Sequence, residues 1–170
     1  MEFDFLHGTG IDALPQFLTS LAIGLLIGLE RERNPSAKAG LRTFALVALF
    51  GTVTALLSAQ LDSPWLLIAG LISVAGMIIG AYINNPVEDK DPGTTTVIAL
   101  LMCYGLGAMI WYGMAKLAVM LAIAVTALLY FKPELSGISQ RLTRRDLVAV
   151  LQFSVLTFII LPILPDQNYG

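Results

Sequence analysis

The chain has 170 residues, of which 56% are hydrophobic and only 13% carry a charge. Soluble domains average roughly 25% charged residues, so this composition is typical of a membrane protein. The net charge is −2 at pH 7 and no basic face with interleaved aromatic residues appears, so nothing supports nucleic acid as a partner.

Six stretches between consecutive charged residues contain no charge at all. A membrane-spanning helix needs about 20 mostly apolar residues, with about 17 as the lower limit. In chain order the stretches are residues 13–29, 43–61, 63–87, 92–115, 117–131 and 147–165. The fifth is long enough only if Lys116 and Lys132 extend toward the polar headgroups at its ends. The sequence therefore predicts an all-α fold, a polytopic membrane helix bundle of about six transmembrane helices.

The ten Lys and Arg residues are unevenly placed around these predicted helices. Nine of them lie in the segments after the first, third and fifth helices, and only Lys116 lies at the opposite end. Short loops rich in Lys and Arg stay in the cytoplasm. We therefore expect a multi-pass protein in contact with the lipid bilayer, with both termini outside the cytoplasm.

Three regions are predicted along the chain. Residues 1–131 form a membrane domain of five helices, residues 132–146 a cytoplasmic amphipathic connector, and residues 147–170 a sixth helix. The connector places Arg141, Arg144 and Arg145 beside apolar residues at helical spacing, which suits a helix lying on anionic lipid. An ordinary structured loop is the alternative. Because the chain stops soon after the sixth helix, we expect that helix to open a second membrane domain of a larger protein.

Groups for catalysis are scarce. The chain has one histidine, His7, and one cysteine, Cys103. No charged residue or histidine lies in the central part of a predicted span, where such a residue commonly marks an ion or proton path. We therefore expect no enzymatic activity, no catalytic residue and no cofactor, with Mg²⁺ as a candidate ligand or substrate.

The candidate polar site lies at the cytoplasmic ends of the first, second and fourth helices. Carboxylates of the kind that end the first helix bind hydrated Mg²⁺, which needs only one or two of them. The alternative is an interfacial salt-bridge network that joins the first two helices, and the acidic Glu88, Asp89 and Asp91 lie on the same side. The candidate site consists of Glu30, Glu32, Arg42, Thr43, Thr94, Thr95 and Thr96; whether it binds a metal stays open.

Small residues repeat every four positions on two of the helices. Small side chains at this spacing let helix backbones approach closely within a bilayer. The first set is Ser20, Gly24 and Gly28, and the second is Gly76, Gly80 and Asn84. Packing within one chain and contact between two chains of a homodimer are both consistent with this pattern.

Two motifs at the candidate site carry a resemblance to a known family. Residues 28–33 read GLERER and residues 39–43 read AGLRT, followed by GTTT at 93–96. In these motifs the chain resembles the MgtC/SapB family of bacterial inner-membrane proteins over about residues 13–131. Residues from Leu142 onward resemble the start of the second membrane domain of long relatives, which we expect to be truncated here after one helix or supplied by a separate chain. Val97 stands where many long relatives have an acidic residue.

The resemblance implies a role in the transport or homeostasis of an ion, with Mg²⁺ as the first candidate, at the bacterial inner membrane. It also implies an alternative, a non-transporting module that regulates another membrane protein such as the ATP synthase. A third alternative is one half of a larger transporter. Enclosing a path usually needs more helices or a symmetric partner, so we expect a homodimer.

Overall fold

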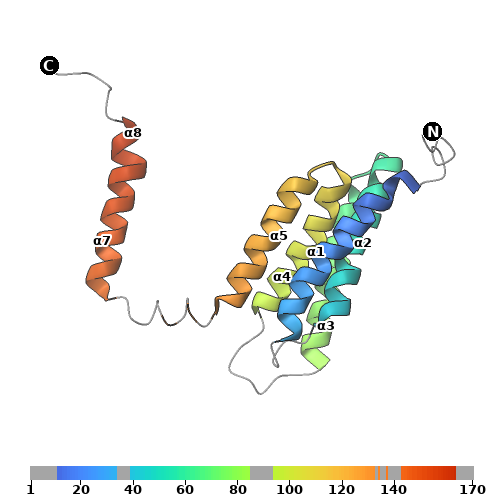
Figure 1. Ribbon diagram of the computed structural model, residues 1–170, viewed down its shortest axis with the longest axis horizontal. Helices are drawn as coiled ribbons and strands as arrows, with labels where there is room; N and C mark the ends of the chain where they lie inside the picture. The colour runs from blue at the N-terminus through green and yellow to red at the C-terminus, as the bar shows by residue number, and fades with distance from the viewer. Residues whose placement is uncertain are drawn as a thin grey trace, which may run out of the picture. The chain divides into compact units, whose positions relative to one another are not determined.

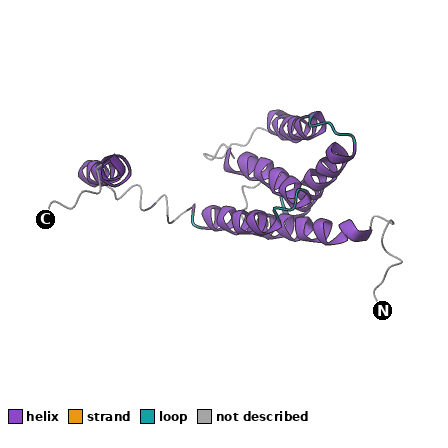
Figure 2. Cartoon of the chain, turned by 90° about the horizontal axis from the view of Figure 1, so that it is seen from above, coloured by secondary structure: helices purple, strands orange, loops and turns teal. Residues whose placement is uncertain are grey.

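The computed structural model describes residues 11–33, 39–84, 94–132, 134, 137 and 143–163. Within these residues every regular element is a helix, as Figure 2 shows. By its internal contacts the chain divides into two compact units, Met1–Tyr130 and Phe131–Gly170. The all-α class predicted from the sequence is therefore confirmed for the described residues.

The first unit is an up-and-down bundle of five helices whose axes run side by side (Figure 1). Helix α4 packs against all four other helices, α2 packs against α1, α3 and α4, and α5 packs against α1 and α4. The helices are α1 (Leu14–Glu32), α2 (Leu41–Gln60), α3 (Trp65–Asn84), α4 (Thr94–Trp111) and α5 (Ala115–Tyr130), and a short 3-10 turn, η2 (Ile11–Ala13), precedes them.

Two of the helices end in the same hydrogen-bonded turn, which makes their connections short. After α4, Gly113 has φ of 81°, and the N–H of Met114 donates to the carbonyl of Met109 at 3.0 Å. After α2, Asp62 has φ of 48°, and the N–H of Ser63 donates to the carbonyl of Ser58 at 3.0 Å. A left-handed residue followed by such a bond closes a helix and reverses the chain. These turns make the links from α2 to α3 and from α4 to α5 short, so each pair of helices is antiparallel.

The contact between α2 and α4 is unusually close because both helices carry glycine there. A Cβ on Gly51 would overlap the carbonyl of Tyr104, and a Cβ on Gly107 would overlap the carbonyl of Ala48. The Thr52 hydroxyl donates to the carbonyl of Gly107 at 2.9 Å. Close backbone contact with a side-chain hydrogen bond across it is typical of helix pairs in membranes.

The outward surface of the bundle is largely aliphatic. Leu46, Ile72 and Met120, from three different helices, are 66%, 64% and 67% exposed. By length and composition, two helices among the described residues qualify as membrane spans, Leu41–Gln60 and Thr94–Trp111. Shorter apolar stretches cover Trp65–Ala81 and Ala115–Tyr130. The number of spans predicted from the sequence stays a prediction.

Two helices extend beyond the uncharged stretches that predicted them and include charged residues. The first stretch stops at residue 29, yet α1 continues to Glu32, because Glu and Arg are good helix formers. The sixth stretch begins at residue 147, yet α7 (Arg144–Val155) begins three residues earlier.

The second unit contains α7, a π-helical turn η3 (Leu156–Ile160) and α8 (Leu161–Ile163). Thr143 caps α7: its hydroxyl donates to Asp146 Oδ2 at 2.7 Å and accepts from the Asp146 N–H at 3.3 Å. The Thr143 N–H also donates to Asp146 Oδ2, at 2.9 Å, which completes a capping box. Leu135, Ile138 and Leu142 of the predicted connector lie outside the described residues.

Candidate functional site

Arg31 is the one charged residue among the buried residues of the described chain. Its relative exposure is 1%, although it stands in the last turn of α1 beside a loop. It extends a buried stripe at helical spacing that contains Ser20, Ile23, Gly24, Ile27 and Gly28. A guanidinium removed from water needs a charged partner and further hydrogen bonds.

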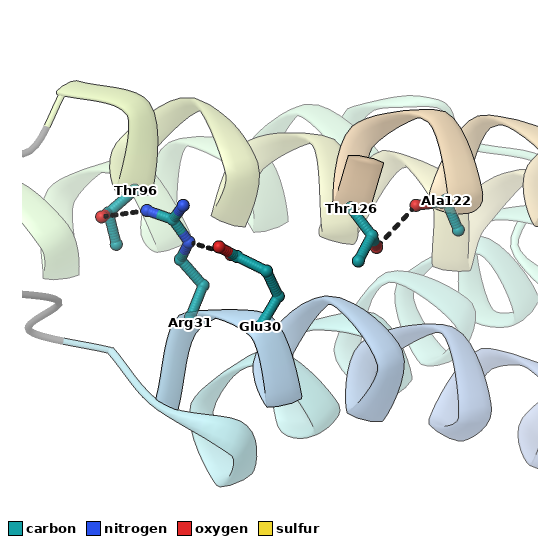
Figure 3. Close-up of polar contacts among 5 residues, drawn as sticks. All are labelled: Glu30, Arg31, Thr96, Ala122 and Thr126. Carbon is teal, nitrogen blue, oxygen red and sulfur yellow. Dashed lines mark hydrogen bonds and ion pairs between the residues drawn. The ribbon is translucent and has the colours of Figure 1, made fainter. Parts of the chain in front are cut away.

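Two side chains meet that need, as Figure 3 shows. Arg31 Nε donates to Glu30 Oε2 at 2.7 Å, and Nη1 donates to Thr96 Oγ1 at 3.4 Å. Nη2 is buried with no hydrogen-bond partner among the described residues. The contact with Thr96 joins the end of α1 to the first turn of α4, so these residues form one polar cluster inside an apolar bundle.

Glu32 makes a separate contact on the other side of α1. Its Oε2 accepts the backbone N–H of Leu41 at 2.9 Å, which satisfies one of the free N–H groups at the start of α2. A Cβ on Gly40 would overlap the same carboxylate. Glu32 therefore acts as a capping residue across the turn from α1 to α2.

The remaining residues of the predicted site are not brought into the Arg31 cluster. Arg42 and Thr94 are exposed. Thr43 lies on a groove between α2 and α3, and Thr95 lies on another groove between α4 and α5. Val97 is partly buried and packs against the hydrophobic core. Of the three threonines, only Thr96 is buried and bound to Arg31.

The two sets of small residues differ sharply in their surroundings. A Cβ on Gly24 would lie 2.7 Å from Ala45 Cα, and one on Gly28 would lie 2.8 Å from Leu41 Cα. These glycines therefore allow α1 to contact α2 within one chain, and Ser20 is buried on the same stripe. A Cβ on Gly76 or on Gly80 would meet no atom of the described chain within 4 Å. Asn84 is the last residue of α3.

No group of three or more His, Cys, Asp or Glu side chains comes together in the part of the chain that the structure describes. The acidic residues predicted to face the basic loop, Glu88, Asp89 and Asp91, lie outside the described residues, as does His7. Cys103 is buried, and its thiol donates to the carbonyl of Phe44 at 3.3 Å, a packing contact between α4 and α2.

The apolar helices and the aliphatic outer surface of the bundle indicate a membrane protein. The model of the MgtC family matches residues 17–138, more than half of the chain, and the protein belongs to that family. This confirms the resemblance found in the GLERER and AGLRT motifs. The comparisons with curated proteins and with solved structures gave no match.

The sequence interpretation missed Arg31, which it counted only among the basic residues of a cytoplasmic loop. The signal was present, because residues 20, 24 and 28 were recognised as a stripe and Arg31 lies on that stripe one turn further. A helix buries the residues of one stripe together, whatever their type.

Proposed function

We propose that this chain is an integral protein of the bacterial inner membrane that acts in Mg²⁺ homeostasis, with both termini outside the cytoplasm. Membership of the MgtC family supports the role, and the apolar outer surface of the bundle supports insertion in lipid. The orientation rests on the position of the basic residues, of which Arg31, Arg33 and Arg42 lie at one end of the bundle.

Within that role, the first unit acts as a non-conducting module that regulates another membrane protein. The observation that carries this proposal is that both carboxylates of the predicted Mg²⁺ site are engaged in structural contacts. Glu30 pairs with Arg31, and Glu32 caps α2. In this conformation neither carboxylate is free to give both of its oxygens to an ion, because Oε2 of each is engaged within the protein.

The buried guanidinium adds an electrostatic argument. Two like unit charges about 4 Å apart repel by about 4 kcal/mol near a protein surface, and a divalent cation doubles that cost. A Mg²⁺ ion that displaced Arg31 from Glu30 in order to bind that carboxylate would be opposed by a repulsion of this size from the guanidinium. Ion transport through a larger assembly is the competing mechanism, in which Glu30 would have to leave Arg31.

The absence of any atom of the described chain within 4 Å of a Cβ at Gly76 or Gly80 supports association through α3. A second copy of the chain or another membrane protein can approach the α3 backbone closely at these positions. Contact at α3 could therefore form either a homodimer or a complex with a partner such as the ATP synthase, and we propose both as alternatives. The α1 backbone at Gly24 and Gly28 is already in contact with α2, so α1 offers no open surface for a partner at these glycines.

Growth at limiting Mg²⁺ tests the proposed role. A strain that lacks the protein should grow poorly at low Mg²⁺ and recover when the chain is supplied. Leucine at Gly80, on the open face of α3, should abolish the rescue while the variant still accumulates in the membrane. Arg42→Gln, at an exposed position of the same cytoplasmic end, is the matched control and should rescue fully. Rescue that does not depend on the Mg²⁺ concentration would overturn the proposal.

A further inference from the structure

A groove between α1 and α5 has a chemical character that the proposed function does not use. It has a volume of ≈ 350 Å³ and opens on the outer surface of the bundle. Most of its wall is aliphatic, formed by Leu26 and Leu29 of α1 and by Ile123 and Ala127 of α5. A volume of this size lies at the lower end of the range for ligand pockets, roughly 300–1,000 Å³.

The polar groups of the groove gather at its cytoplasmic end. Glu30, in the last turn of α1, and Arg33, the residue that follows the helix, both line it there. The Glu30 side chain is 13% exposed and is held in place by the Arg31 guanidinium. Arg33 is exposed, so its guanidinium reaches water or headgroups. The groove therefore presents one negative and one positive charge beside an aliphatic channel.

Thr126 lies on the α5 side of the same groove, and its hydroxyl donates to the carbonyl of Ala122 at 2.8 Å (Figure 3). That proton is therefore committed within α5. The Thr126 hydroxyl therefore adds no competing donor to the groove. Tyr130 also lines the groove, and the charges available for the recognition of a ligand are those of Glu30 and Arg33.

The physics of the bilayer indicates which of these features select a ligand. An acyl chain gains little from an aliphatic groove, because the surrounding lipid tails are equally apolar. Selection must come from the charged end. A guanidinium binds phosphate through two parallel hydrogen bonds, and a carboxylate accepts hydrogen bonds from a primary ammonium. A headgroup that contains both a phosphate and a primary ammonium complements Arg33 and Glu30 together.

We propose that the groove between α1 and α5 binds one phosphatidylethanolamine molecule of the cytoplasmic leaflet. The phosphate contacts Arg33, the ammonium contacts Glu30, and one acyl chain lies along Leu26, Leu29 and Ile123. This inference rests on the membrane placement and orientation proposed above, and it is independent of the role in Mg²⁺ homeostasis. Arg31 is a positioning residue for the site, because it fixes the Glu30 carboxylate at the edge of the groove.

The test is a lipid titration of the full chain, purified in detergent, stripped of lipid and followed by native mass spectrometry. Phosphatidylethanolamine, phosphatidylcholine and phosphatidylglycerol with identical acyl chains are the probes. The expected order places phosphatidylethanolamine first, because the quaternary ammonium of phosphatidylcholine cannot donate hydrogen bonds and phosphatidylglycerol has no cation. Loss of one charge-assisted hydrogen bond should weaken binding about ten- to hundredfold.

Three variants separate the parts of the site. Arg33→Gln should weaken binding of all three lipids, because each carries the phosphate. Glu30→Gln should remove the preference for phosphatidylethanolamine over phosphatidylcholine, and Ala127→Phe should obstruct the channel. Arg42→Gln is the matched control, an exposed arginine outside the groove, and should bind like the original chain. Thermal unfolding of each variant shows whether it is folded.

Equal affinity for the three lipids, or an Arg33→Gln variant that binds like Arg42→Gln, would overturn the proposal. A disulfide formed by Ala127→Cys with a second copy of the chain would also overturn it, because a protein surface would then occupy the groove. In either case, rescue of growth at low Mg²⁺ by the original chain would leave the proposed function standing.

Discussion

Arg31 Nη1 donates to Thr96 Oγ1 across 65 positions of sequence and thereby ties the last turn of α1 to the first turn of α4. The same guanidinium binds Glu30 through Nε at 2.7 Å. One buried side chain thus connects two helices at the end of the bundle where we place the cytoplasm. The Glu30 carboxylate balances its charge.

Removal of Arg31 should destabilise the bundle strongly. Arg31→Gln leaves the Glu30 carboxylate without its charged partner, and breaking a buried pair in this way costs about 3 kcal/mol. Arg31→Lys keeps the charge but lacks the forked donors, so it should recover only part of the loss. Denaturant unfolding in detergent measures both variants.

Two comparisons sharpen this experiment. Arg42→Gln, at an exposed position, should change the unfolding free energy by no more than about 0.5 kcal/mol. The double variant Glu30→Leu/Arg31→Met removes both charges and should recover much of the loss. An Arg31→Gln variant as stable as Arg42→Gln would contradict the role assigned to the cluster.

Glu32 should matter as a hydrogen-bond acceptor rather than as a metal ligand. Glu32→Ala removes the acceptor for the Leu41 N–H and should cost about 1 kcal/mol, as loss of a helix cap usually does. Glu32→Gln keeps an acceptor oxygen and should lose less. Hydrogen exchange at the first amides of α2 is the measurement. If the two variants exchange equally fast, the charge and not the hydrogen bond is what stabilises the turn.

Gly24 and Gly76 each stand four residues before another glycine, yet their replacement by alanine should affect the stability of the bundle differently. Gly24→Ala places a Cβ 2.7 Å from Ala45 Cα, so α1 and α2 must separate, and overpacking of this kind costs about 1–3 kcal/mol. Gly76→Ala meets no atom within 4 Å and should leave the stability of the monomer unchanged or slightly raised. Thermal unfolding compares the pair directly. A Gly24→Ala variant that melts like the original chain would show that the helices are not in close contact there.

The cap of α7 should weaken at acid pH. The Thr143 hydroxyl, bonded to Asp146, and the Thr143 backbone N–H lower the pKa of that carboxyl from its ordinary value of 3.8. A lowered pKa in the folded state means that the carboxylate stabilises α7 above the ordinary pKa, and that this contribution is lost as the pH falls through the lowered value. Thr143→Val should return the Asp146 pKa toward 3.8, as NMR titration of its carboxyl carbon would show. Because the variant keeps the backbone N–H, an unchanged pKa would remove the Thr143 hydroxyl as a cause.

The sequence predicted the helices and the family well because both depend on local patterns. Uncharged stretches located α1 to α5, and the GLERER and AGLRT motifs identified the family. The partners of individual charges were not predictable in the same way. Glu30, Arg31, Glu32 and Arg33 are consecutive, and only the direction in which each side chain leaves the helix decides that Arg31 is buried while Arg33 is exposed.

The small-residue repeats show a second limit of sequence reasoning. Gly24 and Gly28 have the same spacing as Gly76 and Gly80, but the first pair contacts α2 and the second pair faces open space. The spacing of small residues predicts that another helix can approach the backbone closely. Whether a helix of the same chain does so depends on how the whole bundle packs. The same holds for the threonines, since Thr96 faces Arg31 while Thr94 is exposed.

Flux of Mg²⁺ into proteoliposomes tests the central claim that the first unit regulates and does not conduct. The full chain, reconstituted with an internal Mg²⁺ dye and with or without a membrane potential, should give no flux above that of protein-free vesicles. Folding of the reconstituted protein is checked by its thermal unfolding. Protein-dependent flux that falls in the Glu30→Gln/Glu32→Gln variant would contradict the account, because the two carboxylates would then serve an ion path.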